Sequence, residues 1–507
     1  MKKLTTKIMD NWKYILTSII CILVCILTFI IEMGSYEIGS RLSSYKYIII
    51  LLIIVIGTLF SYFINKVYKK NIKLENLFLA IIIPLGLLYM IVMPLGRVPD
   101  ENNHFYRSYE VSQVKLISKK NKEGYGGNYL PSNITEAFTG KTTYSYEIKN
   151  SNIKTSKKTK FINYSNTALY SFINYIPQAI GILLGRIFNL PIFWLAVLGR
   201  LSNFLIWTLL MYFSIKFIPY KKLSLLIMIL SPMMLQEAAS LSADALTNGS
   251  IFFFIAYILY LRNNKNKQIT NKNMVILYII TIIMSVCKIV YLPLCLLVFL
   301  LPEKKFKTKK EKYIKILVLA IIVIIVSGSF FVLSTGYKSL NSETSNINMA
   351  LQLKYIIQNP VTYILTLFRT IYIDFNGYIS GFIGENLCWF DVSISSMFYR
   401  LICLLFVLIA VLDSTKIDNT NKLLQFIVSA LVILLIFTSE YLAWTDVYSN
   451  VIKGVQGRYF IPLTIPLLLL FNLDNLKFDL NKIYKYLLII IVNINLSVLI
   501  TLFAAHF

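Results

Sequence analysis

Residues 304–334 read KKFKTKKEKYIKILVLAIIVIIVSGSFFVLS, a lysine-rich stretch followed by an apolar run. A helix needs about 20 apolar residues to cross the hydrocarbon core of a bilayer, and this run is long enough. Basic clusters beside such runs keep that end of a helix in the cytoplasm, and seven lysines lie between Lys304 and Lys315. The stretch therefore predicts a transmembrane helix over residues 313–334 that begins on the cytoplasmic side.

The same pattern extends over the whole chain of 507 residues. Hydrophobic residues make up 57% and charged residues 15%, with a mean hydropathy of +0.67, which excludes a soluble domain of this length. The first run follows Lys2, Lys3 and Lys7 without a small-residue cleavage site, so a retained helix is predicted and not a signal peptide. Thirteen helices are predicted, at residues 14–31, 47–65, 77–95, 193–215, 222–237, 244–261, 273–287, 289–301, 313–334, 395–412, 422–439, 458–472 and 484–504, with the C-terminus outside.

The formal charge of +26 could suggest a nucleic-acid partner, but none is expected, because the basic residues form short clusters between apolar runs. There they act as orientation signals. The six cysteines lie mostly inside apolar runs, so no disulfide framework is implied. The clusters placed in the cytoplasm are Lys2–Lys13, Lys66–Lys73, Lys216–Lys222, Arg262–Lys272 and Lys304–Lys315.

The predicted fold is all-α, a polytopic membrane protein with one integrated membrane domain. Three N-terminal helices occupy residues 1–95, and residues 96–192 form a long extracytoplasmic loop that carries interfacial helices. Residues 193–507 form the rest of the bundle. Two apolar segments broken by polar residues, 166–190 and 353–376, are assigned to the outer interface. If either one spans the membrane, every later segment inverts.

Acidic and basic residues gather at the predicted outer helix ends. A proton-coupled transporter would instead be expected to hold such groups near the bilayer midplane, on helices interrupted by Gly or Pro. Any chemistry is therefore predicted at the extracytoplasmic face of a cell-membrane protein. The residues concerned are Asp100, Glu101, Glu237, Asp244, Asp374, Glu385, Asp391, Glu440 and Asp446, with Arg107, Lys288, Arg369, Lys453 and Arg458.

The densest group of these residues is RVPDENNHFYRSYEVS, residues 97–112. Pro99 suits the first position of a helix, which would place Asp100, His104 and Arg107 on one face. Asp100 and Glu101 could simply complement the helix N-terminus. Alternatively, a carboxylate at the membrane surface acts as a general base or metal ligand. With only two histidines in the chain, a zinc site is not favoured.

Three further segments carry charged residues at predicted outer helix ends. Asp244 follows residues 231–243 in the first turn of a helix, where capping is the simple role. Lys288 interrupts an apolar hairpin beside Tyr291; it could snorkel, or it could receive an anionic head group. Arg458 opens the segment Arg-Tyr-Phe-Ile-Pro, where it could anchor an interfacial aromatic belt that includes Tyr459.

The order of these motifs resembles the GT-C superfamily of membrane glycosyltransferases. Within it, Pro-Asp-Glu-x-x-His at 99–104, Lys-x-x-Tyr-Leu-Pro at 288–293 and Gln-Gly-Arg-Tyr-Phe at 456–460 resemble a bacterial membrane-protein family known only as a domain of unknown function. The resemblance extends from about residue 80 to 470. It implies an inverting transfer of a sugar from a polyprenyl-phosphate carrier to an extracytoplasmic glycan or glycopolymer acceptor, with Asp100 as the base.

This sequence departs from the superfamily pattern in two ways. Two extra helices precede the first loop, and Asp100 is paired with Glu101 where a spaced Asp-x-Asp would be typical. Whether Asp100, Glu101 and Asp244 hold a divalent cation, Mg²⁺ or Mn²⁺, is therefore left open.

The chemistry of transfer assigns roles to the remaining residues. An acceptor hydroxyl needs a carboxylate base, and the departing lipid phosphate needs cationic donors such as Lys288 and Arg458. The sequence contains no Gly-rich phosphate loop of the kind that would bind a nucleotide sugar. The alternatives are a transporter or flippase of lipid-linked saccharides and a non-catalytic subunit of a polysaccharide-export complex. The other predicted substrate-binding residues are Glu101, His104, Arg107, Asp244, Tyr291, Gln456 and Tyr459.

Overall fold

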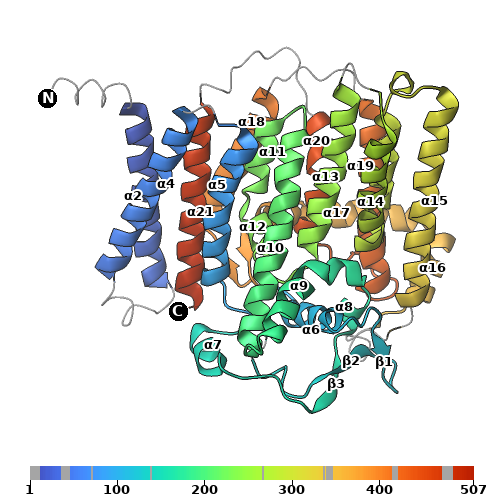
Figure 1. Ribbon diagram of the computed structural model, residues 1–507, viewed down its shortest axis with the longest axis horizontal. Coiled ribbons are helices and arrows are strands. Elements are labelled where there is room, and N and C mark those ends of the chain that lie inside the picture. The colour runs from blue at the N-terminus through green and yellow to red at the C-terminus, as the bar shows by residue number, and fades with distance from the viewer. Residues whose placement is uncertain are drawn as a thin grey trace.

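The computed structural model describes residues 12–35, 46–69, 72–137, 140–264, 268–334, 337, 346–413, 421–470 and 483–506. Helices that run up and down form a bundle, and a smaller unit built from residues 96–192 covers its lower end (Figure 1). This is the predicted all-α membrane architecture with a folded first loop.

Among the described residues, eight helices are long and apolar enough to cross a membrane. The quoted stretch forms one of them, α15, whose apolar side chains remain largely exposed, as a helix facing lipid requires. The eight helices are α2 (Trp12–Ser35), α4 (Lys46–Lys69), α5 (Leu74–Val92), α10 (Ile192–Phe217), α13 (Asp244–Asn263), α15 (Lys309–Ser334), α19 (Lys422–Ala443) and α21 (Tyr484–His506).

Within the described residues, each of the thirteen predicted ranges overlaps helical structure, but some helices are short or broken. Residues 471–472 of the predicted range 458–472 lie outside the described residues. The prediction of one helix over 222–237 is wrong: α11 (Lys222–Ile229) ends before Pro232, and α12 (Pro232–Ala238) begins there. Proline lacks an amide N–H and clashes with the preceding turn, so a helix ends or restarts at it. The number of membrane crossings stays a prediction, because only eight helices have the length of a span.

Two other predicted helices take the tighter 3₁₀ form. Residues 289–301 form η2 (Ile289–Leu300), which follows α14 (Asn271–Cys287) and contains Pro293. Residues 458–472 begin as η4 (Gly457–Leu463) and continue as α20 (Thr464–Leu470). The predicted helix at 395–412 is found as α18 (Ser396–Leu412).

The described basic clusters share one end of the bundle. The connections from α4 to α5, from α10 to α11 and from α13 to α14, and the start of α15, all lie at the upper end in Figure 1. This common placement agrees with the predicted orientation signals. Lys2, Lys3 and Lys7 lie outside the described residues.

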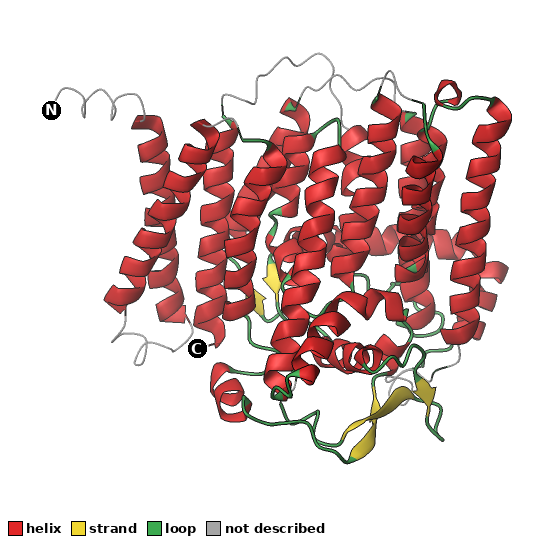
Figure 2. Ribbon diagram, viewed as in Figure 1, coloured by secondary structure: helices red, strands yellow, loops and turns green. Residues whose placement is uncertain are grey.

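The covering unit is more elaborate than the predicted interfacial helices. It contains an antiparallel sheet, in the order β1-β2-β3, which was not predicted (Figure 2). Segment 166–190, predicted at the interface, forms η1 and α9 across the lower end of the bundle. The elements are α6 (Glu101–Ser112), β1 (Lys119–Lys120), β2 (Gly126–Pro131), α7 (Tyr144–Asn150), β3 (Thr159–Asn163), α8 (Ser165–Ala168), η1 (Phe172–Tyr175) and α9 (Ile176–Ile187).

The second predicted interfacial segment, 353–376, lies in α16 (Met349–Gln358) and α17 (Pro360–Ile383), neither of which is among the eight spans. A short hairpin, β4 (Asn386–Leu387) and β5 (Val392–Ser393), follows α17. Helix α12 packs against α17 and β4, so this later part of the chain reaches the broken region of the bundle.

Close packing fixes the covering unit to the bundle. Helix α9 lies so near α10 that a Cβ added at Gly181 would be 2.0 Å from the carbonyl oxygen of Leu198. Small residues allow helix backbones to approach in this way. Helix α10 also packs against α13 and α5, so it connects the covering unit to the polar interior described next.

Candidate active site

Most of the predicted functional residues meet where helices break. Asp244 begins α13 directly after the break that follows α12, and Lys288 joins α14 to η2. Arg458 lies in the first turn of η4, and Asp100 directly precedes α6. Broken helices free backbone and side-chain polar groups, which membrane proteins use to build sites inside a bundle.

Lys288 and Asp244 form one ion pair that is largely shielded from solvent. The Lys288 Nζ lies 2.6 Å from the Asp244 Oδ1, and the two side chains are 14% and 13% exposed. The ammonium also lies 4.7 Å from the ring centroid of Tyr459 and 5.8 Å from that of Tyr170. The Tyr291 hydroxyl donates to the Tyr459 carbonyl at 2.9 Å and holds this aromatic wall in place. Lys288 therefore does not snorkel to the surface, and Asp244 has a partner beyond its own helix.

Arg458 and Glu237 form a second pair beside it. The Arg458 Nη1 donates to the Glu237 Oε1 at 2.7 Å, and Glu237 is 1% exposed. The Arg458 Nε, the Glu237 Oε2 and the Gln456 Oε1 are buried without a hydrogen-bond partner among the described residues. Buried polar atoms are nearly always paired with protein or water, so these three atoms retain capacity for further hydrogen bonds.

Asp100 does not cap α6. Its backbone is left-handed, with φ 59° and ψ 13°, and its side chain accepts no bond from the helix N-terminus. The Asn166 Nδ2 donates to the Asp100 Oδ1 at 2.9 Å, while no described residue forms a hydrogen bond to the other carboxylate oxygen. Burial raises the pKa of Asp100, although the Arg458 guanidinium and Asn166 oppose the increase. A raised pKa and an unoccupied oxygen are what a general base needs.

His104 is held as a neutral side chain near both ion pairs. Its Nδ1 lies 2.9 Å from the Tyr175 hydroxyl. Burial lowers the pKa of His104 to about 3, against a smaller opposing effect of the Asp244 carboxylate. The imidazole can therefore donate or accept a hydrogen bond at neutral pH without adding positive charge.

Two other predicted binding residues are used by the fold itself. Glu101 is fully buried; Arg200 grips both its oxygens at 2.7 Å, and the amides of Gly96 and Leu241 also donate to them. Arg107 is 1% exposed and pairs with Glu110 on its own helix. The bidentate contact of Glu101 with Arg200 joins α6 to α10 and occupies both Glu101 oxygens. The Arg107–Glu110 pair lies within α6, and the Arg107 Nε has no hydrogen-bond partner among the described residues.

The residues predicted as metal ligands do not fit a metal ion. Glu101 has both oxygens occupied by Arg200, and Asp244 is neutralised by Lys288. In the described part of the chain, no three His, Cys, Asp or Glu side chains come together closely enough to hold a cation. In this arrangement Glu101 and Asp244 are therefore not available as ligands for Mg²⁺ or Mn²⁺.

Sequence reasoning missed several residues of the site. Glu237 and Glu440 were recognised only as acids at outer helix ends, although Glu237 pairs with Arg458 and Glu440 lies against Gly454. A carboxylate in an apolar run was the available signal for both. Asn166 and Tyr170 had no signal, because an amide or tyrosine in a loop is common.

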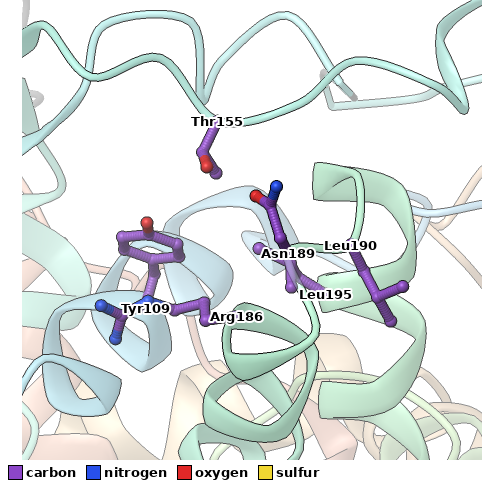
Figure 3. A pocket seen from close by; sticks show the side chains of 6 residues that line it. All are labelled: Tyr109, Thr155, Arg186, Asn189, Leu190 and Leu195. Carbon is purple, nitrogen blue, oxygen red and sulfur yellow. The ribbon is translucent and has the colours of Figure 1, made fainter.

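A surface pocket lies apart from these charged pairs. It has a volume of about 230 Å³ and is lined by Tyr109, Thr155, Arg186, Asn189, Leu190 and Leu195 (Figure 3). The Arg186 guanidinium lies 5.2 Å from the Tyr109 ring centroid and donates to the Ser112 carbonyl, so it supports the wall of the pocket. None of the charged groups around Asp100 lines it.

The chain was compared with known proteins. No curated protein and no solved structure matches it. The family model described as "Predicted membrane protein (DUF2142)" matches residues 83–468, which include every residue of the candidate active site. Because this match covers most of the chain and agrees with its membrane-spanning helices, the protein belongs to the DUF2142 family of predicted membrane proteins.

Proposed function

We propose that this protein transfers a sugar from a polyprenyl-phosphate carrier to the hydroxyl of a glycan or glycopolymer acceptor. Transfer would take place at the end of the bundle covered by residues 96–192, which we assign to the extracytoplasmic face. The observation that carries the proposal is Asp100, a partly buried carboxylate with one oxygen bonded by Asn166 and the other without a partner among the described residues. Its left-handed backbone costs about 1 kcal/mol, a strain found often at functional sites.

Asp100 would act on the acceptor. As the acceptor oxygen forms its bond to the anomeric carbon, its proton passes to the free carboxylate oxygen of Asp100. The bond from the anomeric carbon to the phosphate oxygen breaks on the opposite side, and its electron pair leaves with the lipid phosphate. This single displacement inverts the anomeric carbon. Positioned base catalysis of this kind typically contributes about 10² to 10⁴ in rate.

Lys288 and Arg458 would act on the donor. Their charges can stabilise the departing phosphate, and the Arg458 Nε is free to form a bond that a bidentate grip requires. Each cation is held by a carboxylate in the resting site, Asp244 for Lys288 and Glu237 for Arg458. Phosphate binding would compete with these carboxylates, which keep the empty site neutral and the cations in position.

The test is transfer by purified protein from a polyprenyl-phosphate sugar compared with a nucleotide sugar. We expect use of the lipid donor, with Lys288→Ala and Arg458→Ala each about tenfold or more less efficient, since a lost charged hydrogen bond costs roughly 1.5 to 3 kcal/mol. Arg262→Ala, at the opposite end of the bundle, is the control and should leave transfer unchanged. Efficient use of a nucleotide sugar, indifferent to both site substitutions, would refute the proposal.

A second candidate is a transporter or flippase of lipid-linked saccharides. The observation that favours it is the placement of Glu237, Lys288 and Arg458 at the break between α12 and α13, at the start of η2 and in η4. Discontinuous helices with charged groups are typical of transporters. Proteoliposomes separate the two functions, because a flippase would move the lipid-linked saccharide across the bilayer without needing Asp100. If the Asp100→Asn variant still moved the lipid-linked saccharide across the bilayer and formed no transfer product, the flippase would be favoured.

A further inference from the structure

The covering unit carries positive charge that the proposed reaction does not use. Residues 96–192 contain thirteen basic and six acidic residues, a net charge of +7. The buried pairs involving Glu101 and Glu110 are neutralised internally by Arg200 and Arg107, so the surplus lies at the surface. Long loops tolerate lysines during translocation, but tolerance does not explain why they gather in one place.

Three of these lysines lie at one edge of the sheet. Lys119 and Lys120 form β1, and Lys122 lies in the turn that leads to β2; all three are exposed. None forms an ion pair with a described residue, although the Lys120 Nζ lies 5.6 Å from the ring centroid of Tyr337. Unpaired lysines at this density produce a local positive potential that attracts anions.

Two aromatic side chains lie beside the lysines. Tyr129 on β2 is paired with Phe161 on β3, and their ring centroids are 5.6 Å apart in an edge-to-face arrangement. Tyr129 is 53% exposed. The face of an aromatic ring is electronegative and attracts weakly positive C–H groups, such as those on the apolar side of a sugar ring. An exposed tyrosine ring therefore provides a surface on which a sugar ring can pack.

The lysines and the aromatic pair line the same pocket. Its volume is about 320 Å³, within the range of small-ligand sites. Asn121 adds an amide, and Glu123 is its one acidic lining residue. We name this pocket the basic sheet surface; its lining residues are Lys119, Lys120, Asn121, Lys122, Glu123, Tyr129 and Phe161.

We propose that the basic sheet surface binds an anionic saccharide chain, a glycan with carboxylate or phosphate groups along it. Charge selects a polyanion, and the exposed Tyr129 selects one that contains sugar rings. The sheet extends beyond the lower ends of the membrane helices, so it faces a chain outside the membrane and not the lipid head groups (Figure 2). Resting on the proposed transferase function, this inference makes the acceptor an anionic glycopolymer.

Binding can be tested without catalysis. The full chain is placed in phosphatidylcholine nanodiscs and titrated with alginate, a polyuronate, and with neutral dextran at several salt concentrations. We expect alginate binding that weakens steeply with salt, and little dextran binding. Replacing Lys119, Lys120 and Lys122 together by Gln should weaken alginate binding about tenfold. The control replaces Lys304, Lys309 and Lys310 at the opposite end of the bundle, which removes the same charge and should change nothing.

Tyr129→Thr separates sugar recognition from charge alone. It should weaken alginate binding about threefold and leave the binding of polyphosphate, a polyanion without sugar rings, unchanged. The inference would be overturned if the replacement of the three sheet lysines and the control replacement at the opposite end weakened alginate binding equally. It would also be overturned if the protein bound phosphatidylglycerol vesicles and not alginate. Alginate binding is measured without a sugar donor and without transfer, so a failure of the catalytic proposal and a failure of this one are distinguishable.

Discussion

At the scale of single residues, Asp100 is the position on which the proposed chemistry depends. Replacing it by Asn keeps the shape and the contact with Asn166 but removes the base, so transfer should fall about 10² to 10⁴-fold. Stability should change by no more than about 1 kcal/mol, because no helix cap is lost. Initial rates and the unfolding midpoint measure the two effects.

The control for Asp100 is Glu136→Gln, an exposed acid in the same covering unit that should retain both activity and stability. Near-normal transfer by Asp100→Asn would remove Asp100 as the base. If that variant failed to accumulate in the membrane while the control did, the role of Asp100 would be structural.

His104 provides a pH prediction that is independent of catalysis. Its pKa is lowered to about 3 in the folded protein by burial, whereas an ordinary histidine titrates near 6.5. As the pH falls below about 6.5, the unfolded chain binds a proton that the folded protein does not. His104 therefore destabilises the folded protein as the pH decreases from about 6.5 toward 3, and it causes no such destabilisation above that range.

His104→Gln retains a hydrogen-bonding group for Tyr175 but has no proton to gain. When the pH is lowered from about 7.5 to 5.5, the melting temperature of the variant should fall less than that of the wild type. The measurement is thermal unfolding in detergent at the two pH values. Equal losses in the two proteins would show that His104 is not held neutral.

At the scale of helices, the approach of α9 to α10 is the contact that seats the covering unit. Gly181→Ala places a methyl group against the backbone carbonyl of Leu198, which a flexible side chain cannot relieve. Overpacking of this kind costs about 1 to 3 kcal/mol, so the melting temperature should fall. Gly328→Ala in α15 is the matched control: nothing lies within 4 Å of its added Cβ, and alanine should be neutral or slightly stabilising.

The breaks between helices support a second prediction at this scale. Lys288→Ala leaves Asp244 buried without its partner, which should cost about 3 to 5 kcal/mol. Adding Asp244→Asn should recover much of that loss in thermal unfolding, while transfer should not recover, because the phosphate-binding cation is still missing. If stability and transfer recover together, Lys288 serves only the fold.

At the scale of the whole molecule, orientation decides which compartment the site faces. A single Cys at Lys122, on the exposed basic sheet surface, should be labelled by an impermeant thiol reagent in intact cells, and one at Thr308 should not. The reverse labelling pattern would place the covering unit in the cytoplasm and end the proposal of extracytoplasmic transfer.

The sequence by itself determined the membrane class, the positions of the long helices and the end of the bundle that is basic, as α15 and its lysines illustrate. These properties depend on local hydropathy and charge, which are read along the chain. It also singled out Asp100, Asp244, Lys288 and Arg458, since charged residues beside apolar runs are conspicuous.

Only the tertiary structure decided which of these charges meet. The pair of Arg458 and Glu237 joins positions that are 221 residues apart in the sequence. Arg200 bonds to the carboxylate of Glu101, which lies 99 residues away in the sequence. Such contacts depend on how α10, α12 and η4 pack and where proline breaks the helices, which no local pattern encodes. The sheet of the covering unit was likewise missed, because β1 has two residues and its pairing partners lie in a polar loop without strong alternation.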